Sequence, residues 1–274
     1  MGYDVHPMTD LNMLTSLPDG VLAPGQVWLA GAGPGDPGLL TLYARSGLAQ
    51  ADVIVHDALV DKRVLALAGP QATLEFAGKR GGKPSATQAD ISNRLIELAK
   101  AGRRVLRLKG GDPCVFGRGG EEAMALAAAG VPFRIIPGVT AGLAALAAAA
   151  IPATLRQLNR AVILAAGHGA ENDAFDWAPL ARAGAPIVLY MVMHNLERIA
   201  AALMRAGQDP QSPVAIIAAA TTSAERILVS TLQHAAQEAR AQAFEPPAIV
   251  VIGDIVAVRD RLLGNAAAAD RGQQ

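Results

Sequence analysis

The chain has 274 residues, a formal net charge of zero and 51% hydrophobic residues. This length suffices for one or two domains with sizeable cores, and the balanced charge argues against a general nucleic-acid binder. The single cysteine, Cys114, excludes an intramolecular disulfide and fits a reducing compartment, so we expect a cytoplasmic protein.

Two further classes are disfavoured by the residue pattern. No uninterrupted apolar run reaches the roughly 18 residues that a membrane span needs, so we expect no membrane partner. The five histidines are scattered without ligand spacing and no CxxC motif occurs, so we expect no metal site. Residues 1–24 contain acidic residues and prolines, and we interpret them as a flexible tail rather than a signal peptide.

From residue 26 onward, short β-rich runs alternate with helical ones. In the first half we expect strands at 26–32, 51–57, 73–79, 103–111 and 132–138, and helices at 38–50, 87–102, 119–130 and 139–150. The helix at 87–102 has Thr87 and Asp90 at the spacing of a capping box, and Gly102 as its stop. This alternation predicts an α/β domain at 25–150 with a mostly parallel sheet.

The segment 151–159 interrupts this rhythm with Pro152 and polar residues, and we interpret it as an interdomain linker. A second α/β domain is expected at 160–263, followed by a flexible tail at 264–274. Its expected strands lie at 161–167, 186–193, 213–219, 226–232 and 247–254, with helices at 176–184, 196–207 and 233–242. Ligands of such proteins bind at strand carboxyl ends, and we expect them in the cleft between the domains.

The glycine-rich loop at 31–38, GAGPGDPG, follows the first expected strand but does not suit a phosphate. A dinucleotide-binding loop would carry a closing glycine where Asp36 stands, and Pro34 removes a backbone N–H donor. Asp36 instead suits a helix cap. A second Gly-Asp-Pro turn, at 111–113, also follows a strand, and the two turns indicate a shared pocket of bare backbone and carboxylates.

Positive charge is concentrated between Lys79 and Arg118, where ten lysines and arginines stand against three acidic residues. The cations at 94–103 belong to a helix and its exit, where a solvated face is the simpler interpretation. Lys79, Arg80 and Lys83 lie in the loop GKRGGKPS. Because this segment is not expected to be helical, these residues cannot be explained as the solvent-exposed face of a helix. These three are therefore better suited to meeting a polyanionic substrate.

Six collinear motifs closely resemble the tetrapyrrole (precorrin) methylase superfamily, and the resemblance runs from about Val27 to Leu262. They are GAGPGDPGLLTL, ADVIVHDALV, GKRGGKPS, RVLRLKGGDPCVFGRGGEEA, PGVTAG and PPAIVVIGD. Two of these, GKRGGKPS and VFGRGGEE, are characteristic of the branch that acts on uroporphyrinogen III. The resemblance implies a homodimer with two α/β domains, the second with a mixed sheet, that binds S-adenosylmethionine in the cleft.

The resemblance also implies a reaction and a set of site residues. Methyl groups would pass to C2 and C7 of uroporphyrinogen III, giving precorrin-2 for cobalamin or sirohaem. Asp57 matches the proton acceptor and Lys79 the proton donor. Asp57 could instead cap the following helix, and Lys79 could pair with a substrate carboxylate. Arg80, Lys83, Arg107 and Arg156 are candidate substrate contacts. The matching cofactor positions are Pro34, Gly110, Gly111, Asp112, Val115, Thr140, Ala141, Met191 and Ala220.

The chain departs from the family pattern at three positions. Leu155 stands where a histidine is usual, Cys114 where an aromatic residue is usual, and Ala219 where an asparagine is common. None of these removes the expected base or the backbone pocket, so we expect an active enzyme. A sister methylase acting on a later corrin intermediate and a non-catalytic tetrapyrrole- or cofactor-binding regulator stay open as alternatives.

Overall fold

The computed structural model describes residues 20–77, 87–167 and 175–270, with side chains up to residue 264. The chain forms two compact units, Met1–Thr140 and Ala141–Gln274. The division falls before the expected linker at 151–159. Helix α6 (Ala141–Ala148) belongs to the second unit because it packs on strands of the second sheet.

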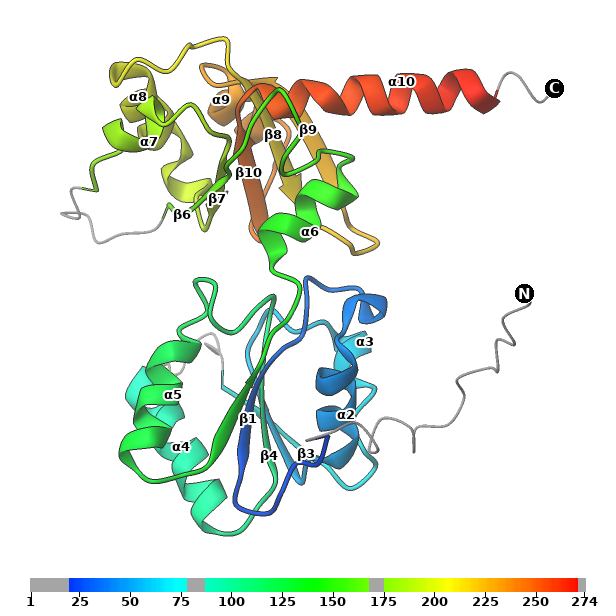
Figure 1. Cartoon of the computed structure of the whole chain (residues 1–274), viewed down its shortest axis with the longest axis vertical. Coiled ribbons are helices and arrows are strands. Elements are labelled where there is room, and N and C mark those ends of the chain that lie inside the picture. Colours follow the sequence, from blue (N-terminus) through cyan, green and yellow to red (C-terminus); the bar gives the residue numbers. More distant parts are fainter. Residues whose placement is uncertain (1–19, 78–86, 168–174, 271–274) are drawn as a thin grey trace. The chain divides into compact units, whose positions relative to one another are not determined.

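The first unit is built on a five-stranded sheet with strand order β3-β2-β4-β1-β5. All pairings are parallel, as expected for strands joined by helical crossovers. The strands are β1 (Val27–Gly31), β2 (Val53–His56), β3 (Thr73–Phe76), β4 (Val105–Lys109) and β5 (Phe133–Ile136). Helices cover both faces (Figure 1): α2 (Leu42–Gln50) and α3 (Lys62–Leu65) on one, α4 (Gln88–Lys100) and α5 (Gly119–Ala128) on the other.

Each face of this sheet has its own hydrophobic core. Leu106 and Leu108 of β4 pack in the core beneath α2 and α3, whereas Val105 packs beneath α4 and α5. Trp28 is fully buried in the first of these cores, with its ring edge-on to Tyr43. The Arg134 guanidinium lies 4.2 Å from the centre of the Tyr43 ring and 5.6 Å from that of Trp28. The alternation along β4 thus sends odd-numbered residues toward α4 and α5.

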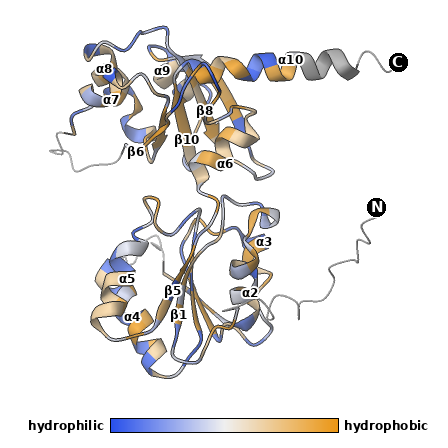
Figure 2. Ribbon diagram, viewed as in Figure 1, coloured by the Kyte–Doolittle hydropathy of each residue, from blue (hydrophilic) through white to orange (hydrophobic). Residues whose placement is uncertain are grey.

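The second unit contains a mixed five-stranded sheet with strand order β6-β7-β10-β8-β9. Strands β6 (Ile163–Ala166) and β7 (Ile187–Tyr190) are parallel, while β10 (Ala248–Ile252) runs antiparallel to β7 and to β8 (Pro213–Ala218). Strand β9 (Arg226–Thr231) is antiparallel to β8. Strands β6, β8 and β10 are predominantly hydrophobic in Figure 2. The remaining helices are α7 (Ala178–Arg182), α8 (Leu196–Arg205), α9 (Ala235–Ala241) and α10 (Val258–Asp270).

The parallel first sheet and the mixed second sheet confirm the predicted fold class. Several elements differ from expectation, and helix α3 was not predicted at all. The helix expected at 38–50 is divided into a 3-10 turn at Pro37–Leu39 and helix α2, because Asp36 caps the turn and Thr41 caps the helix. Helix α10 continues through residues expected to form a flexible tail. Within the described ranges, no helix has both the length and the apolar character to cross a membrane.

Candidate functional site

Three glycine-containing loops meet at the carboxyl edge of the first sheet. Gly33 and Gly111 pair as a short antiparallel bridge, with N–H···O distances of 3.1 and 2.7 Å. A Cβ atom on Gly31 would lie 2.5 Å from the Gly111 oxygen and 2.6 Å from the Gly138 Cα. The loops after β1, β4 and β5 therefore pack backbone against backbone, which only glycine permits at these positions.

The carboxylates of the two Gly-Asp-Pro turns are engaged by backbone groups. Asp36 Oδ1 accepts a hydrogen bond from Gly38 N at 2.8 Å. Asp112 Oδ1 accepts from Cys114 N at 2.8 Å, and its Oδ2 accepts from Gly138 N at 3.0 Å. These carboxylates fix the shape of the loops. What the loops offer to a ligand is mainly backbone.

Asp57, the expected base, lies at this same edge, directly after β2. Its side chain is half-buried, and its Oδ1 accepts from Leu59 N at 3.2 Å and, more weakly, from Gly110 N at 3.4 Å. The alternative role as a helix cap belongs to Asp61, whose Oδ1 accepts from Arg63 N at the start of α3. Asp57 therefore does not cap α3, and it lies next to the loop that follows β4.

A buried ionic cluster lies beneath the edge, on the side of α4 and α5. Glu122 of α5 is fully buried, and its Oε1 accepts from Arg107 Nε at 3.1 Å and Lys109 Nζ at 3.3 Å. Gln88 of α4 donates to the same oxygen at 3.0 Å. Burial, with the Arg107 charge, lowers the pKa of Lys109, while Glu122 and Asp57 oppose that shift. We call Arg107, Lys109, Glu122 and Gln88 the Glu122 cluster.

The Glu122 cluster revises one sequence-based expectation and adds residues that the sequence analysis missed. Arg107 was expected to contact substrate, but its side chain is only 3% exposed and is paired with Glu122. Lys109 and Glu122 were not singled out. The available signal was the Arg-Leu-Lys alternation in β4, since buried parallel strands are usually continuous hydrophobic runs.

Two further cations near these loops, Arg63 and Arg118, are also paired. Arg63 binds Asp61 at 3.0 Å and Arg118 binds Glu121 at 2.7 Å. Pro34 and Val115 are half-buried loop residues and Thr140 is buried just before α6. Lys79, Arg80 and Lys83 lie outside the described residues. In the part of the chain that the structure describes, no group of three or more metal-ligating side chains occurs.

In the second unit, Met191 and Ala220 lie at the same edge of the sheet, after β7 and β8. Met191 is 47% exposed and has a φ of 54°, and Ala219 has a φ of 48°. Non-glycine residues in this left-handed region are uncommon and cluster at functional sites. Arg156 is exposed in the segment 151–159, where Asn159 Oδ1 accepts from Leu155 N and closes a small loop.

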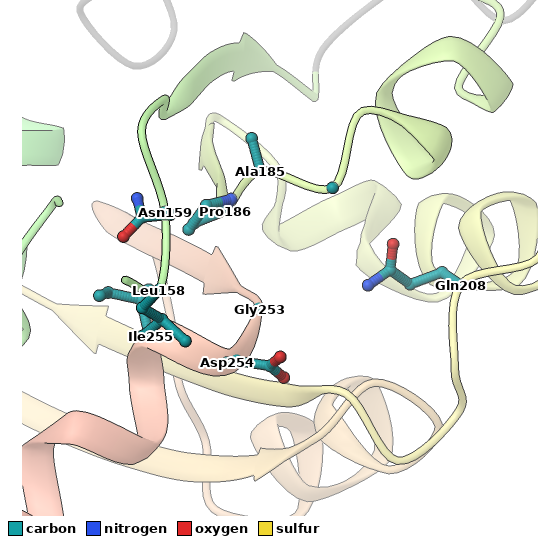
Figure 3. A pocket seen from close by; sticks show the side chains of 9 residues that line it. Leu158, Asn159, Ala185, Pro186, Gln208, Gly253, Asp254 and Ile255 are labelled. Atoms are coloured by element: carbon teal, nitrogen blue, oxygen red, sulfur yellow. The ribbon is translucent and has the colours of Figure 1, made fainter. Parts of the chain in front are cut away.

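A pocket in the second unit lies at the opposite edge of that sheet (Figure 3). Its polar lining includes Asn159, Gln208 and Asp254. The Asn159 amide donates to the Ala153 and Ala161 carbonyls, and Gln208 Nε2 donates to Ser212 Oγ. Among the predicted site residues that the structure describes, none lines this pocket.

Comparison with known proteins gives a consistent result. The family model of the tetrapyrrole (corrin/porphyrin) methylases matches residues 26–236. A uroporphyrinogen-III C-methyltransferase from Sinorhizobium is 55% identical over 244 residues, covering 88% of this chain and 87% of that protein. Siroheme synthase 2 of Aeromonas hydrophila is 45% identical over 239 residues, which are 87% of this chain but only 50% of the relative. The chain therefore spans about half the length of the siroheme synthases it matches.

Solved structures agree with these sequence relatives. The uroporphyrin-III C-methyltransferase of Thermus thermophilus, in complex with S-adenosyl homocysteine, is 39% identical with a TM-score of 0.73. That match covers 85% of this chain and 99% of the other. A cobalt precorrin-4 methyltransferase is 27% identical with a TM-score of 0.76, covering 88% and 98% of the two chains.

Proposed function

The chain belongs to the tetrapyrrole (corrin/porphyrin) methylase family, and on that premise we propose that it is an S-adenosylmethionine-dependent methyltransferase acting on uroporphyrinogen III. The proposed reaction adds methyl groups at C2 and C7 and yields precorrin-2 through the singly methylated precorrin-1. The 55% identity to the Sinorhizobium uroporphyrinogen-III C-methyltransferase supports this substrate.

The described residues fit a cofactor that has a positive charge and no phosphate. The glycine loops after β1, β4 and β5 present backbone. Four cations near them are paired with Asp61, Glu121 or Glu122, namely Arg63, Arg107, Lys109 and Arg118. S-adenosylmethionine, when bound, supplies an electrophilic methyl group on a sulfonium. In this proposal the residues that hold it in the first unit are Pro34, Gly110, Gly111, Asp112, Val115 and Thr140. Ala141, Met191 and Ala220 are the proposed contacts of the second unit.

The observation that carries the mechanism is the place of Asp57 beside Gly110. Methylation of a pyrrole carbon forms a carbon–carbon bond, and a proton must then be removed from the substrate. Asp57 Oδ1 is held by two backbone N–H groups, and the structure describes no hydrogen bond to Oδ2. That second oxygen is available to accept the proton. Lys79 would donate a proton or pair with a substrate carboxylate, together with Arg80, Lys83 and Arg156.

The proposal is tested by incubating the purified chain with uroporphyrinogen III and methyl-labelled S-adenosylmethionine. We expect two labelled methyl groups per tetrapyrrole and the absorption of precorrin-2 after oxidation. Binding of S-adenosyl homocysteine without methyl incorporation would contradict the enzyme assignment and favour a non-catalytic regulator. Incorporation only into later precorrins would favour a sister methylase. The cobalt precorrin-4 methyltransferase, which has a similar fold, is an enzyme of that kind.

Two further parts of the proposal concern assembly and location. The enzyme acts as a homodimer, as the family resemblance implies, and works in the cytoplasm, which suits its single cysteine. Light scattering of the full chain measures the mass directly. A mass of about 28 kDa, that of one chain, would contradict the dimer.

A further inference from the structure

The Glu122 cluster contains more positive than negative charge. Two cations, Arg107 and Lys109, share the single carboxylate of Glu122, and both are nearly fully buried. All three described donors converge on Oε1, while Oε2 has no hydrogen-bond partner within the described ranges. A buried charge without a counter-charge is costly, so a second carboxylate close to the cluster would stabilise it.

Asp57 is the carboxylate that the sheet register brings to the cluster. Strands β2 and β4 pair with His56 opposite Leu108 and Val55 opposite Arg107. Asp57 follows β2 directly and Lys109 is the last residue of β4, so the two residues lie at the same edge of the sheet. The Gly110 N–H, in the peptide that follows Lys109, donates to Asp57 Oδ1 at 3.4 Å.

Arg107 and Lys109 lie on the face of the sheet that packs against α4 and α5. Val55 packs in the core beneath α4 and α5, and Arg107 and Lys109 bind Glu122 of α5 on that same side. Residues two apart along a strand share a face. Lys109 therefore continues the face of Arg107, and the charge of Asp57, just beyond the end of β2, opposes the lowering of the Lys109 pKa.

We propose that Lys109 is a positioning residue for the methyl-transfer reaction, and that its ammonium group, anchored by Glu122, supplies the charge that balances and orients Asp57. This inference rests on the proposed function, because it assigns Lys109 to the support of the proposed base. Lys109 itself is 5% exposed and bound to Glu122, so it acts through Asp57 and not on the substrate.

The charged and titratable groups around Asp57 define the test. From β4 they are Arg107 and Lys109, from α5 Glu122, and from β2 His56, whose ring Nδ1 lies 3.2 Å from the Asp57 carbonyl. Asp112 lies in the loop that follows β4. Of these, Lys109 is the group whose replacement should destabilise the fold least, because Lys109→Met leaves Arg107 and Glu122 as an ion pair with no net charge.

The first measurement is an NMR titration of the Lys109 side chain in protein labelled at lysine Cε, assigned with Lys109→Arg. The Asp57 charge raises the pKa of Lys109, so Asp57→Asn should lower that pKa below its wild-type value. Lys100, exposed at the far end of α4, is the internal control and should not move. An identical Lys109 titration in wild type and Asp57→Asn would overturn the proposed charge interaction between Lys109 and Asp57.

The second measurement is turnover. Lys109→Met should lower kcat by on the order of tenfold near neutral pH and leave the affinity for S-adenosyl homocysteine unchanged. Lys109→Arg, which keeps the positive charge, should recover part of kcat. Lys100→Met, the matched control, should behave as wild type. A kcat for Lys109→Met equal to wild type at every pH would overturn the positioning role.

The two measurements separate this inference from the proposed function. An inactive wild-type chain contradicts the proposed function and the positioning role of Lys109 with it, while the titration still decides whether the Asp57 charge acts on Lys109. An active wild-type chain with an unaltered Lys109→Met variant contradicts only the inference. Unfolding of Lys109→Met in guanidinium, measured beside Lys100→Met, identifies a loss of activity that comes from a loss of fold.

Discussion

Four aspartates at one edge of the first sheet have different tasks because their backbone surroundings differ. Asp36 caps a 3-10 turn, Asp61 caps α3, and Asp112 ties two loops together with both of its oxygens. Asp57 uses one oxygen for backbone N–H groups, with no described hydrogen bond to the other. A carboxylate with one oxygen fixed and one available is suited to accept a proton from a positioned substrate.

Replacing Asp57 by Asn should separate binding from turnover. The amide oxygen can still accept from the Leu59 and Gly110 N–H groups, but the group no longer accepts a proton. We expect cofactor affinity close to wild type and kcat lower by roughly 100- to 10,000-fold. Calorimetric binding of S-adenosyl homocysteine and single-turnover methyl transfer measure the two effects. Turnover within threefold of wild type would remove Asp57 from the role of base.

Cys114 gives a prediction about pH. Cys114 is exposed, but desolvation by the surrounding loop and the nearby Asp112 raise the pKa of its thiol, so less thiolate is present at neutral pH than in a free cysteine. Alkylation by a maleimide should therefore be slower than that of glutathione at pH 7 and should rise with a midpoint at higher pH. Because Cys114 lies between the proposed cofactor contacts Asp112 and Val115, S-adenosyl homocysteine should slow the reaction. Equal rates with and without this ligand would argue against cofactor contact at this loop.

At the scale of elements, the site depends on three loops that approach one another more closely than side chains allow. A Cβ atom on Gly138 would overlap the Gly111 carbonyl oxygen, and the neighbouring atoms belong to backbone. Because their backbones are in contact, a displacement of one of the loops after β1, β4 and β5 requires a displacement of the other two. This close approach keeps backbone groups of separate loops at one edge of the sheet.

Gly138→Ala should accordingly damage both stability and binding. We expect a loss of about 1–3 kcal/mol in the free energy of unfolding, the usual cost of forcing a backbone shift, and weaker binding of S-adenosyl homocysteine. Gly120→Ala is the matched control, since nothing lies within 4 Å of its added Cβ atom and it sits inside α5. That control should be neutral or more stable. Wild-type binding by Gly138→Ala would show that the loops can separate.

Helix α4 offers a test of local stability away from the site. Thr87 Oγ1 accepts from Asp90 N at 3.2 Å, and Asp90 Oδ2 accepts from Thr87 N at 2.7 Å, which is a complete capping box. Thr87→Ala should lower the free energy of unfolding by about 1 kcal/mol, whereas Thr87→Ser should retain most of it. Equal stability of the two variants in urea would show that the cap contributes little.

Sequence reasoning succeeded where a local rule determines the structure. The capping box of α4 and the Asp36 cap depend on residues at most three positions apart, and both are present as predicted. The role of Arg107 could not be found this way, because its burial depends on Glu122, fifteen residues away on another element. From the sequence alone, a cation such as Arg107 near the end of a strand is predicted to contact substrate. Whether its side chain reaches the substrate or is buried depends on the face of the sheet on which it lies.

For the molecule as a whole, the sequence predicted two α/β units and the type of each sheet, but the structure divides them at Thr140 and Ala141 instead of at 151–159. Helix α6, AGLAALAA, has no polar face, so its sequence cannot indicate which sheet it covers. Its contacts with β7 and β10 decide the matter. Within the second unit, the Tyr190 hydroxyl accepts from Gly142 N at 3.0 Å and holds the start of this helix.

The burial of Trp28 provides an intrinsic optical reporter. The chain has two tryptophans, Trp28 in the first unit and Trp177 in the second, so each unit carries one tryptophan. In the Trp177→Phe background, tryptophan emission comes from Trp28 alone, beneath the Arg134 guanidinium. Its red shift in denaturant then follows the first unit by itself. A ligand that binds the glycine loops should move that transition to higher denaturant, which locates binding without any assay of methyl transfer.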